Sequence, residues 1–192
     1  PYLRAELDLG VPVFSVEAFQ FSDSGIGTLS GSFGSPSFGN ISGGTQVASD
    51  LDFSNVKAAM TFDIGLGPVK LSPGLAVDFF DLDLRVQDIA GFVEENVSLT
   101  APVPMLFLRA EGDLGIVAGV VELGGLKTPK IQDIEGTFWD AEARIELRPS
   151  TMFHLFAGYR IIHVEGNGNM DNQDFETSFD ISGWLIGGGL RF

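Results

Sequence analysis

Two short stretches of the chain contain residue types that hydrolytic enzymes use. Asp81-Leu82-Asp83 holds two carboxylates two residues apart, and His163-Val164-Glu165 holds an imidazole close to a further acid. Carboxylates that flank a site can activate water, with histidine as the general base. This chemistry requires the two stretches to meet at one end of the fold, so the elements that carry them have to be considered.

Paired aspartates with a histidine at a barrel mouth are similar to the omptin proteases, which are ten-stranded. In that family an aspartate stands two residues before the histidine, where this chain has Ile161. His154 could belong to a barrel lipase that trims lipid A, but no His-x-Ser sequence occurs in the chain. We therefore assign no catalytic residue, expect no enzyme, and expect His154 to be a hydrogen-bonded lumen residue.

The stretch 166–174 has alternating oxygen ligands at Asn167, Asn169 and Asp171, as calcium loops do. An EF-hand needs glycine where Asn172 stands and glutamate where Ser178 stands. We expect no metal site and no cofactor, and leave open that acidic loops bind divalent cations beside anionic lipopolysaccharide.

The composition excludes several classes of protein. A chain of 192 residues suits one domain, 1–192, with a sizeable core. It is 44% hydrophobic yet carries a formal net charge of −15, and its longest apolar run, 116–121, is far shorter than the ~20 residues of a membrane helix. The chain has no cysteine, which excludes disulfides, and its acidity disfavours nucleic acid as a partner.

Apolar and polar residues alternate with period two along most of the chain. Between Trp139 and Arg148 the odd positions are apolar and every even position is charged. This pattern predicts β-strands with one apolar and one polar face. Such strands form either a soluble sandwich or a membrane barrel with lipid outside and a polar lumen.

The connections favour the barrel, because short and long ones alternate as periplasmic turns and extracellular loops do. We therefore predict an all-β, transmembrane, antiparallel up-and-down β-barrel in a bacterial outer membrane. Short turns are expected at 10–12, 67–68, 113–115 and 148–150, and long polar connections at about 22–54, 81–94, 127–136 and 165–174.

The pattern gives nine strands in this chain, and bacterial single-chain barrels have even numbers. We expect a tenth, N-terminal strand before Pro1 in the native protein; a competing count merges 2–21 into one strand and gives eight. The nine predicted strands are 2–9, 14–21, 55–66, 70–80, 95–111, 116–126, 137–147, 152–164 and 175–192.

The chain ends in alternating apolar residues, with Trp184, Ile186, Leu190 and Phe192 expected to face lipid and Arg191 the lumen. This ending resembles the C-terminal signal by which outer-membrane proteins are recognised for insertion. The resemblance implies the barrel-assembly machinery as a partner during insertion.

Charged residues on the polar faces should point into the lumen. In a small barrel side chains fill the interior, and buried charges have to pair to offset their desolvation. We expect a salt-bridge network that plugs the lumen, with a narrow polar conduit as the alternative. The expected network comprises Arg4, Glu6, Asp8, Lys57, Asp63, Asp78, Arg109, Glu111, Asp113, Asp140, Glu142, Arg144, Glu146, Arg148, Arg160 and Arg191.

Two stretches, VASDLDFS at 47–54 and LTAPVPMLF at 99–107, resemble an uncharacterised proteobacterial outer-membrane barrel family, the OmpW-like GlyGly group. The resemblance implies the same fold and location but no activity. We expect a small outer-membrane protein with a plugged lumen and acidic extracellular loops, acting structurally or through its surface, in contact with lipid and lipopolysaccharide. The alternatives are a passive channel for small or apolar molecules and, third, a lipid A hydrolase or omptin-like protease.

Overall fold

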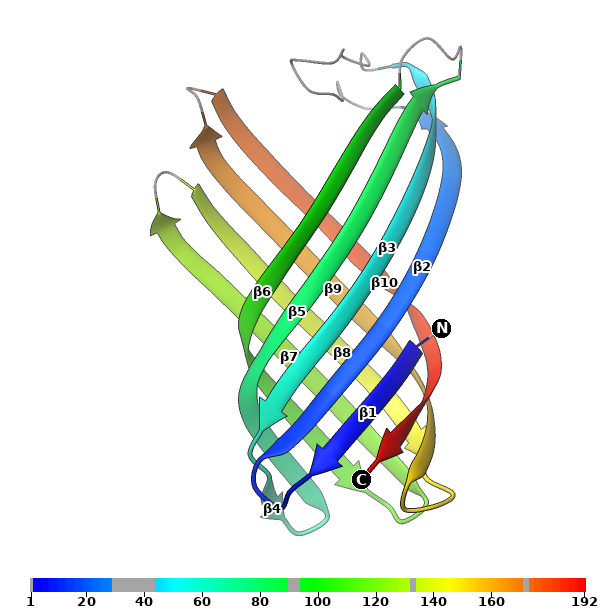
Figure 1. Ribbon diagram of the computed structural model, residues 1–192, viewed down its shortest axis with the longest axis vertical. Helices are drawn as coiled ribbons and strands as arrows, with labels where there is room; N and C mark the ends of the chain where they lie inside the picture. The colour runs from blue at the N-terminus through cyan, green and yellow to red at the C-terminus, as the bar shows by residue number, and fades with distance from the viewer. Residues whose placement is uncertain (1, 29–43, 90–93, 132–133, 171–172) are drawn as a thin grey trace. The chain divides into compact units, whose positions relative to one another are not determined.

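The computed structural model describes residues 2–28, 44–89, 94–131, 134–170 and 173–192 (Figure 1). Every regular element in these ranges is a β-strand, as the period-two pattern predicts, and none of them contains a helix long and apolar enough to cross a membrane. The strands are β1 (Tyr2–Asp8), β2 (Val13–Thr28), β3 (Gln46–Thr61), β4 (Ile64–Leu66), β5 (Val69–Asp88), β6 (Glu94–Asp113), β7 (Val117–Ile131), β8 (Ile134–Leu147), β9 (Phe153–Met170) and β10 (Gln173–Arg191).

The strands form one closed sheet, which confirms the predicted barrel fold. Neighbours follow the order β3-β2-β1-β10-β9-β8-β7-β6-β5-β4, and β3 also pairs with β5. That additional pairing closes a ring of nine strands and leaves β4 as a short extra strand beside β5.

The seam between β1 and β10 differs from the antiparallel pattern that we expected. These two strands pair in parallel over five residues, from Tyr2↔Gly187 to Glu6↔Arg191. The parallel direction follows from the odd number of strands, because in a ring of nine strands that alternate in direction the first and the last run the same way. Parallel pairing is also slightly less stable per residue than antiparallel pairing.

The described chain divides into two compact units. The larger unit comprises residues 1–18, 56–78 and 103–192, and it contains at least part of each of the nine strands of the ring. The smaller unit comprises 19–55 and 79–102, with parts of β2, β3, β5 and β6.

The strands extend further than the sequence pattern indicated, which corrects the predicted long loops. Residues 22–28, 46–54 and 81–88 are strand. Their polar side chains pair with neighbouring strands, as Ser22 does with Asp52 and Thr100 with Asp81. Polar residues on an exposed strand face therefore resembled loop sequence.

The inner part of the smaller unit is aromatic. Phe53 is buried, and its ring lies 5.5–5.8 Å from those of Phe19, Phe21 and Phe80. These phenylalanines form the apolar core of that unit.

Two of the tight turns share one construction, and each follows a copy of the sequence LRAE-x-DLG, at 3–10 and at 108–115. The construction accounts for the aspartate and the glycine that the two copies share. Gly10 and Gly115 have positive φ angles of 84° and 90°, a conformation that glycine adopts without steric cost. In each turn the glycine N–H donates to the aspartate two residues earlier, Asp8 at 2.8 Å and Asp113 at 2.7 Å. Both aspartates thus close turns, and this role holds them at the turn side of the ring, the end where the β1–β2 and β6–β7 turns lie.

Candidate functional site: an ion-paired lumen

The alternation along β8 shows how the strands divide the charged from the apolar residues. Asp140, Glu142, Arg144 and Glu146 are 2–3% exposed, whereas Ile145 between them is 66% exposed. Successive side chains of a strand point to opposite faces. The strand therefore places its charges inside the ring and its apolar residues outside.

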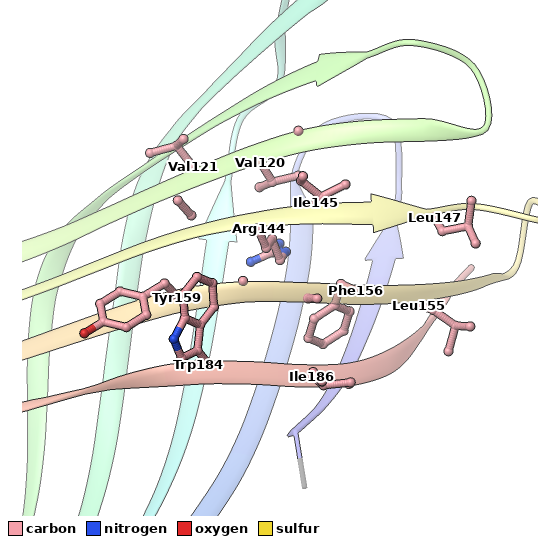
Figure 2. A pocket seen from close by; sticks show the side chains of 15 residues that line it. Val120, Val121, Arg144, Ile145, Leu147, Leu155, Phe156, Tyr159, Trp184 and Ile186 are labelled. Atoms are coloured by element: carbon pink, nitrogen blue, oxygen red, sulfur yellow. The ribbon is translucent and has the colours of Figure 1, made fainter.

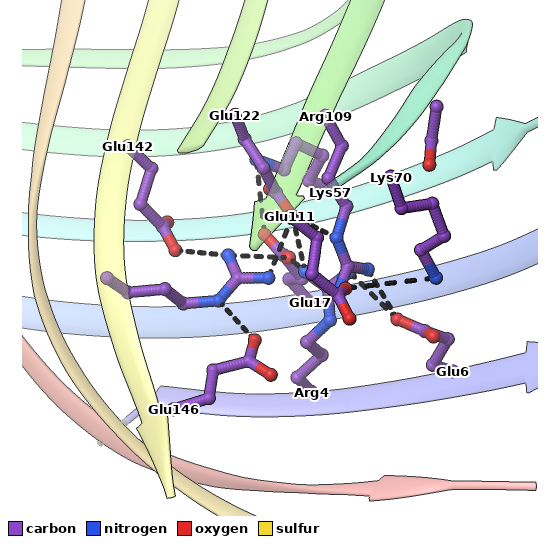
Figure 3. Close-up of polar contacts among 12 residues, drawn as sticks. Arg4, Glu6, Glu17, Lys57, Lys70, Arg109, Glu111, Glu122, Glu142 and Glu146 are labelled. Carbon is purple, nitrogen blue, oxygen red and sulfur yellow. Dashed lines mark hydrogen bonds and ion pairs between the residues drawn. The ribbon is translucent and has the colours of Figure 1, made fainter. Parts of the chain in front are cut away.

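Arg144 pairs with three buried glutamates, Glu122, Glu142 and Glu146, which Figure 3 labels. Its guanidinium contacts Glu142 at 2.6 Å, Glu122 at 2.8 Å and Glu146 at 2.8 Å. All four side chains are at least 98% buried. Since guanidinium donates from a rigid fork, this arrangement uses each of its three nitrogens.

Glu122 and Glu17 connect Arg144 to two further cations. Arg4 pairs with both glutamates, and its nitrogen lies 2.9 Å from Glu122. The Lys57 ammonium lies 3.1 Å from Glu17, 3.3 Å from Glu122 and 3.2 Å from Asp140, across β2, β7 and β8. The ion pairs thus join strands that are distant along the sheet.

On the side of Arg144 away from the tight turns, Arg160 binds Asp140 through two nitrogens, both at 2.8 Å. A second carboxylate, Asp78, lies 3.6 Å from Arg160 and is fully buried. Bidentate pairs of this kind are among the strongest hydrogen bonds in proteins.

At the turn side the network reaches solvent. Arg109 pairs with Glu6 and, at 2.7 Å, with Glu111. Arg148 contacts Glu111 at 2.7 Å and Glu146 at 2.6 Å. Burial lowers the pKa of Arg148, but its hydrogen bonds to these two glutamates outweigh burial and raise that pKa above its ordinary value.

The charges of the lumen nearly balance. Five basic and eight acidic side chains are buried among the described residues. Arg148 and Arg191, half-buried cations at the turn side, pair with three of these carboxylates, Glu111, Glu146 and Glu6. A third half-buried cation, Lys70, pairs mainly with the half-buried Asp63 at 2.8 Å and lies 3.8 Å from Glu111. The half-buried cations thus offset most of the excess of buried carboxylates.

The structure brings most of the expected network together. Asp63, Arg148 and Arg191 are half-buried. Asp8 and Asp113 are exposed at the ends of β1 and β6, where they lie 3.7 Å from Arg191 and 3.9 Å from Arg148. The remaining expected members are buried: Arg4, Glu6, Lys57, Asp78, Arg109, Glu111, Asp140, Glu142, Arg144, Glu146 and Arg160.

Sequence reasoning missed several members of the network. Glu17 was detectable, because it alternates with the outward Phe14 and Val16. Glu122 had no clear signal, since both faces of β7 around it are apolar. Tyr2 was also missed; its hydroxyl lies 2.7 Å from Glu17 and 2.9 Å from Glu142.

Each residue that could have formed a hydrolase site has a separate structural partner. His163 is on the outer face of β9 and bonds Asp180 at 2.6 Å. Asp81 and Asp83 accept hydrogen bonds from Thr100 and Ser98 in the smaller unit.

His154 lies in the lumen, 94% buried against Phe156, as expected. Its Nε2 forms no hydrogen bond with the described part of the chain, contrary to expectation. The imidazole packs directly on Gly189, where an added Cβ would lie 2.5 Å from Nε2. His154 and Arg191 both line a cavity of about 440 Å³ that opens at the turn side.

No group of three metal-binding side chains occurs among the described residues. The side chains of 166–170 and 173–179, and residues 171–172 entirely, lie outside the description, so the expectation of no calcium site at 166–174 is not tested.

The C-terminal residues lie on the outer face. Trp184 and Ile186 are 85% and 79% exposed, and Leu190 and Phe192 are also exposed. Arg191 between them turns inward and contacts Glu6 at 3.0 Å.

These features define a class of structure: a closed β-barrel with an apolar outer surface and an ion-paired interior. No family model, no curated protein and no solved structure matches the chain. The resemblance to the OmpW-like group therefore stays a prediction.

Proposed function

We propose that this chain is a small outer-membrane β-barrel protein whose lumen is plugged by ion-paired side chains, and that it acts structurally or through its surface rather than as an enzyme. The observation that carries the proposal is the distribution of polarity. Thirteen charged side chains are buried among the described residues of the larger unit, while large apolar side chains cover its outside. A protein folded in water has the opposite arrangement.

The height of the apolar surface supports a membrane location. Outward apolar residues extend from Trp139 to Leu147 on β8 and from Val69 to Phe79 on β5. At the rise of a strand and a tilt of about 40°, these stretches span roughly 20 and 25 Å along the barrel axis. Outer-membrane barrels have an apolar band of about 25 Å.

Insertion is the first test. The purified chain should require detergent to stay monodisperse, and it should enter liposomes as a folded species that runs faster than the boiled chain on a gel. A monodisperse β-protein in plain buffer would contradict the membrane assignment, because the exposed apolar side chains would then need no lipid.

Conductance separates the plugged barrel from the passive channel. Because ion-paired side chains fill the lumen around Arg144, we expect the native protein to conduct no measurable current across a planar bilayer. Removing the central charges in an Arg144→Ala/Glu122→Ala variant should open conductance if that variant remains folded, whereas Leu114→Ala, at an 81% exposed turn position, should stay silent. Steady single-channel currents from the native protein would favour the channel.

The outward position of the C-terminal residues supports the proposal that the barrel-assembly machinery recognises them during insertion. Phe192 is 58% exposed at the end of β10 and is free to be contacted from outside. A Phe192→Ser variant should accumulate outside the membrane in cells while refolding normally in detergent.

A further inference from the structure

The larger unit has two hollows of different chemistry. The one on its outer face, about 890 Å³ over β7 to β10, is lined almost entirely by apolar groups, among them Trp184, Ile145 and Leu155 (Figure 2). In the proposed membrane location lipid tails cover this face, so that hollow selects no particular ligand. The cavity of about 440 Å³ at the turn side differs, because charged and hydroxyl side chains line it.

The charged side chains on the wall of this turn-side cavity are equal in number and paired with one another. Three arginines and three carboxylates line it: Arg109, Arg148, Arg191, Glu6, Asp113 and Glu146. Glu6 pairs with Arg109 and, at 3.0 Å, with Arg191. Arg148 lies 2.6 Å from Glu146 and 3.9 Å from Asp113. These six side chains carry no net formal charge, and a charged ligand would have to compete with their pairs.

The same wall retains unused hydrogen-bonding groups. A guanidinium has five N–H donors. Arg148 directs three of them at two glutamates. Arg191 makes two carboxylate contacts within the described part of the chain, one of them at 3.7 Å, so most of its donors are available. The hydroxyl groups of Ser150 and Thr151 line the cavity as well.

Two rings complete the wall. His154 is buried, and its Nε2 has no hydrogen-bond partner among the described residues. Phe153 also lines the cavity and is 43% exposed, so part of its apolar surface is accessible. The cavity therefore combines paired charges, spare donors and an aromatic surface.

We propose that the turn-side cavity binds one neutral sugar ring. A hydroxyl group both donates and accepts, so it bonds to a guanidinium N–H and a carboxylate oxygen without separating the pair. The C–H groups of a sugar ring pack on an aromatic surface such as that of Phe153. The volume suits a small molecule, since ligand pockets usually have about 300–1,000 Å³. All lining residues belong to the larger unit, so the inference does not depend on the membrane assignment.

Titration with three sugars of the same ring geometry tests the proposal. Glucose is neutral, glucosamine is cationic and glucuronate is anionic; the protein is folded in a detergent without a sugar headgroup. The chain has two histidines, so NMR signals of the His154 ring report on the cavity, and those of His163, on the outer face of β9, are the internal control. We expect glucose to shift the His154 signals saturably at millimolar concentration and to leave His163 unchanged.

The charged sugars should bind about two- to fivefold more weakly than glucose, the range that an exposed charge pair is worth. Arg191→Gln removes one cation and should make glucosamine the preferred sugar. Asp113→Asn removes one anion but keeps the oxygen that accepts from the Gly115 N–H, and it should favour glucuronate.

A bulky substitution tests the position of the ligand. Thr151→Phe narrows the cavity and should weaken glucose binding several-fold. The matched control is Met152→Phe at the next residue, which is 53% exposed and is not part of the lining, and this variant should bind glucose as the native protein does.

A glucose titration without a saturable shift of His154 overturns the proposal, as does tighter binding of either charged sugar by the native protein. Zwitterionic alanine is the further comparison, and binding of alanine at lower concentration than glucose also overturns it. If Thr151→Phe does not fold, the sugar series on the native protein decides alone. Failure of the membrane assignment is distinct, because it appears as a chain that stays monodisperse without detergent.

Discussion

Replacing Arg144 with methionine should destabilise the barrel more than any surface substitution. The methionine side chain retains the apolar volume but removes the cation that contacts Glu122, Glu142 and Glu146 at 2.6–2.8 Å. Three buried carboxylates then face one another without their shared partner. Breaking a buried ion pair by removing one member costs about 3–5 kcal/mol, so we expect a loss of that size in the free energy of unfolding.

Denaturant unfolding of the folded protein in lipid or detergent measures the loss. The control is Arg85→Met, which breaks the pair of Arg85 with Glu94 at 3.1 Å, where the side chains are 58% and 50% exposed. An exposed pair contributes at most about 1 kcal/mol. If the Arg144 and Arg85 variants lose equal stability, the lumen is hydrated and the ion-paired plug is refuted.

A second substitution keeps the test informative if the Arg144 variant folds poorly. Glu142 contacts Arg144 and Tyr2, so Glu142→Gln in the Arg144→Met background removes one of the unpaired charges. The double variant should recover part of the loss, with a coupling energy of about 0.5–3 kcal/mol. Simple additivity of the two substitutions would show that the pair is not coupled.

Three further predictions concern the wall of the barrel. Gly158→Ala should destabilise the fold by about 1–3 kcal/mol, because the new Cβ would lie 2.4 Å from the Ala143 carbonyl oxygen. The control Gly183→Ala, whose Cβ would have no atom within 4 Å, should change stability by less than about 0.5 kcal/mol. Denaturant unfolding midpoints compare the two variants. Trp184→Lys should lower the fraction inserted into liposomes, since a lysine on the lipid face costs up to about 2–4 kcal/mol, while Leu114→Lys in a turn should insert normally. Asp113→Ala should cost about 1 kcal/mol by removing the acceptor of the Gly115 N–H, and an unchanged midpoint would show that this turn needs no cap.

The inside and outside of the barrel were predictable from the sequence because the period-two pattern is strong. Between Trp139 and Arg148 every second residue is charged, so one register places all those charges on one face. The same reasoning correctly places Arg191 inside and Trp184 outside.

Three features could not be predicted in the same way. Glu122 is the one charge in the apolar part of β7, residues 117–126. Its role depends on cations from other strands, Arg4, Lys57 and Arg144. The sequence predicts loops where residues 46–54 of β3 and 81–88 of β5 are strand, because acidic and hydroxyl side chains on a solvent-facing strand resemble loop composition. The parallel seam leaves no local signal, since the direction of β1 relative to β10 depends on the number of strands in the ring.

The ion pairs of the lumen explain why this ring adopts one register. A slip of β8 by one residue would turn Arg144, Glu142 and Glu146 outward together and separate Arg144 from Glu122 on β7. It would also replace Ile145 outside with a charge. Outward apolar residues alone distinguish the two faces of a strand, but they do not distinguish slips of two residues. The contacts of Lys57 with β2, β7 and β8 do, because a slip of two residues moves each carboxylate about 7 Å along its strand and beyond reach of the ammonium. The buried charges therefore contribute specificity of strand pairing more than net stability, since a well-packed apolar interior would be about as stable.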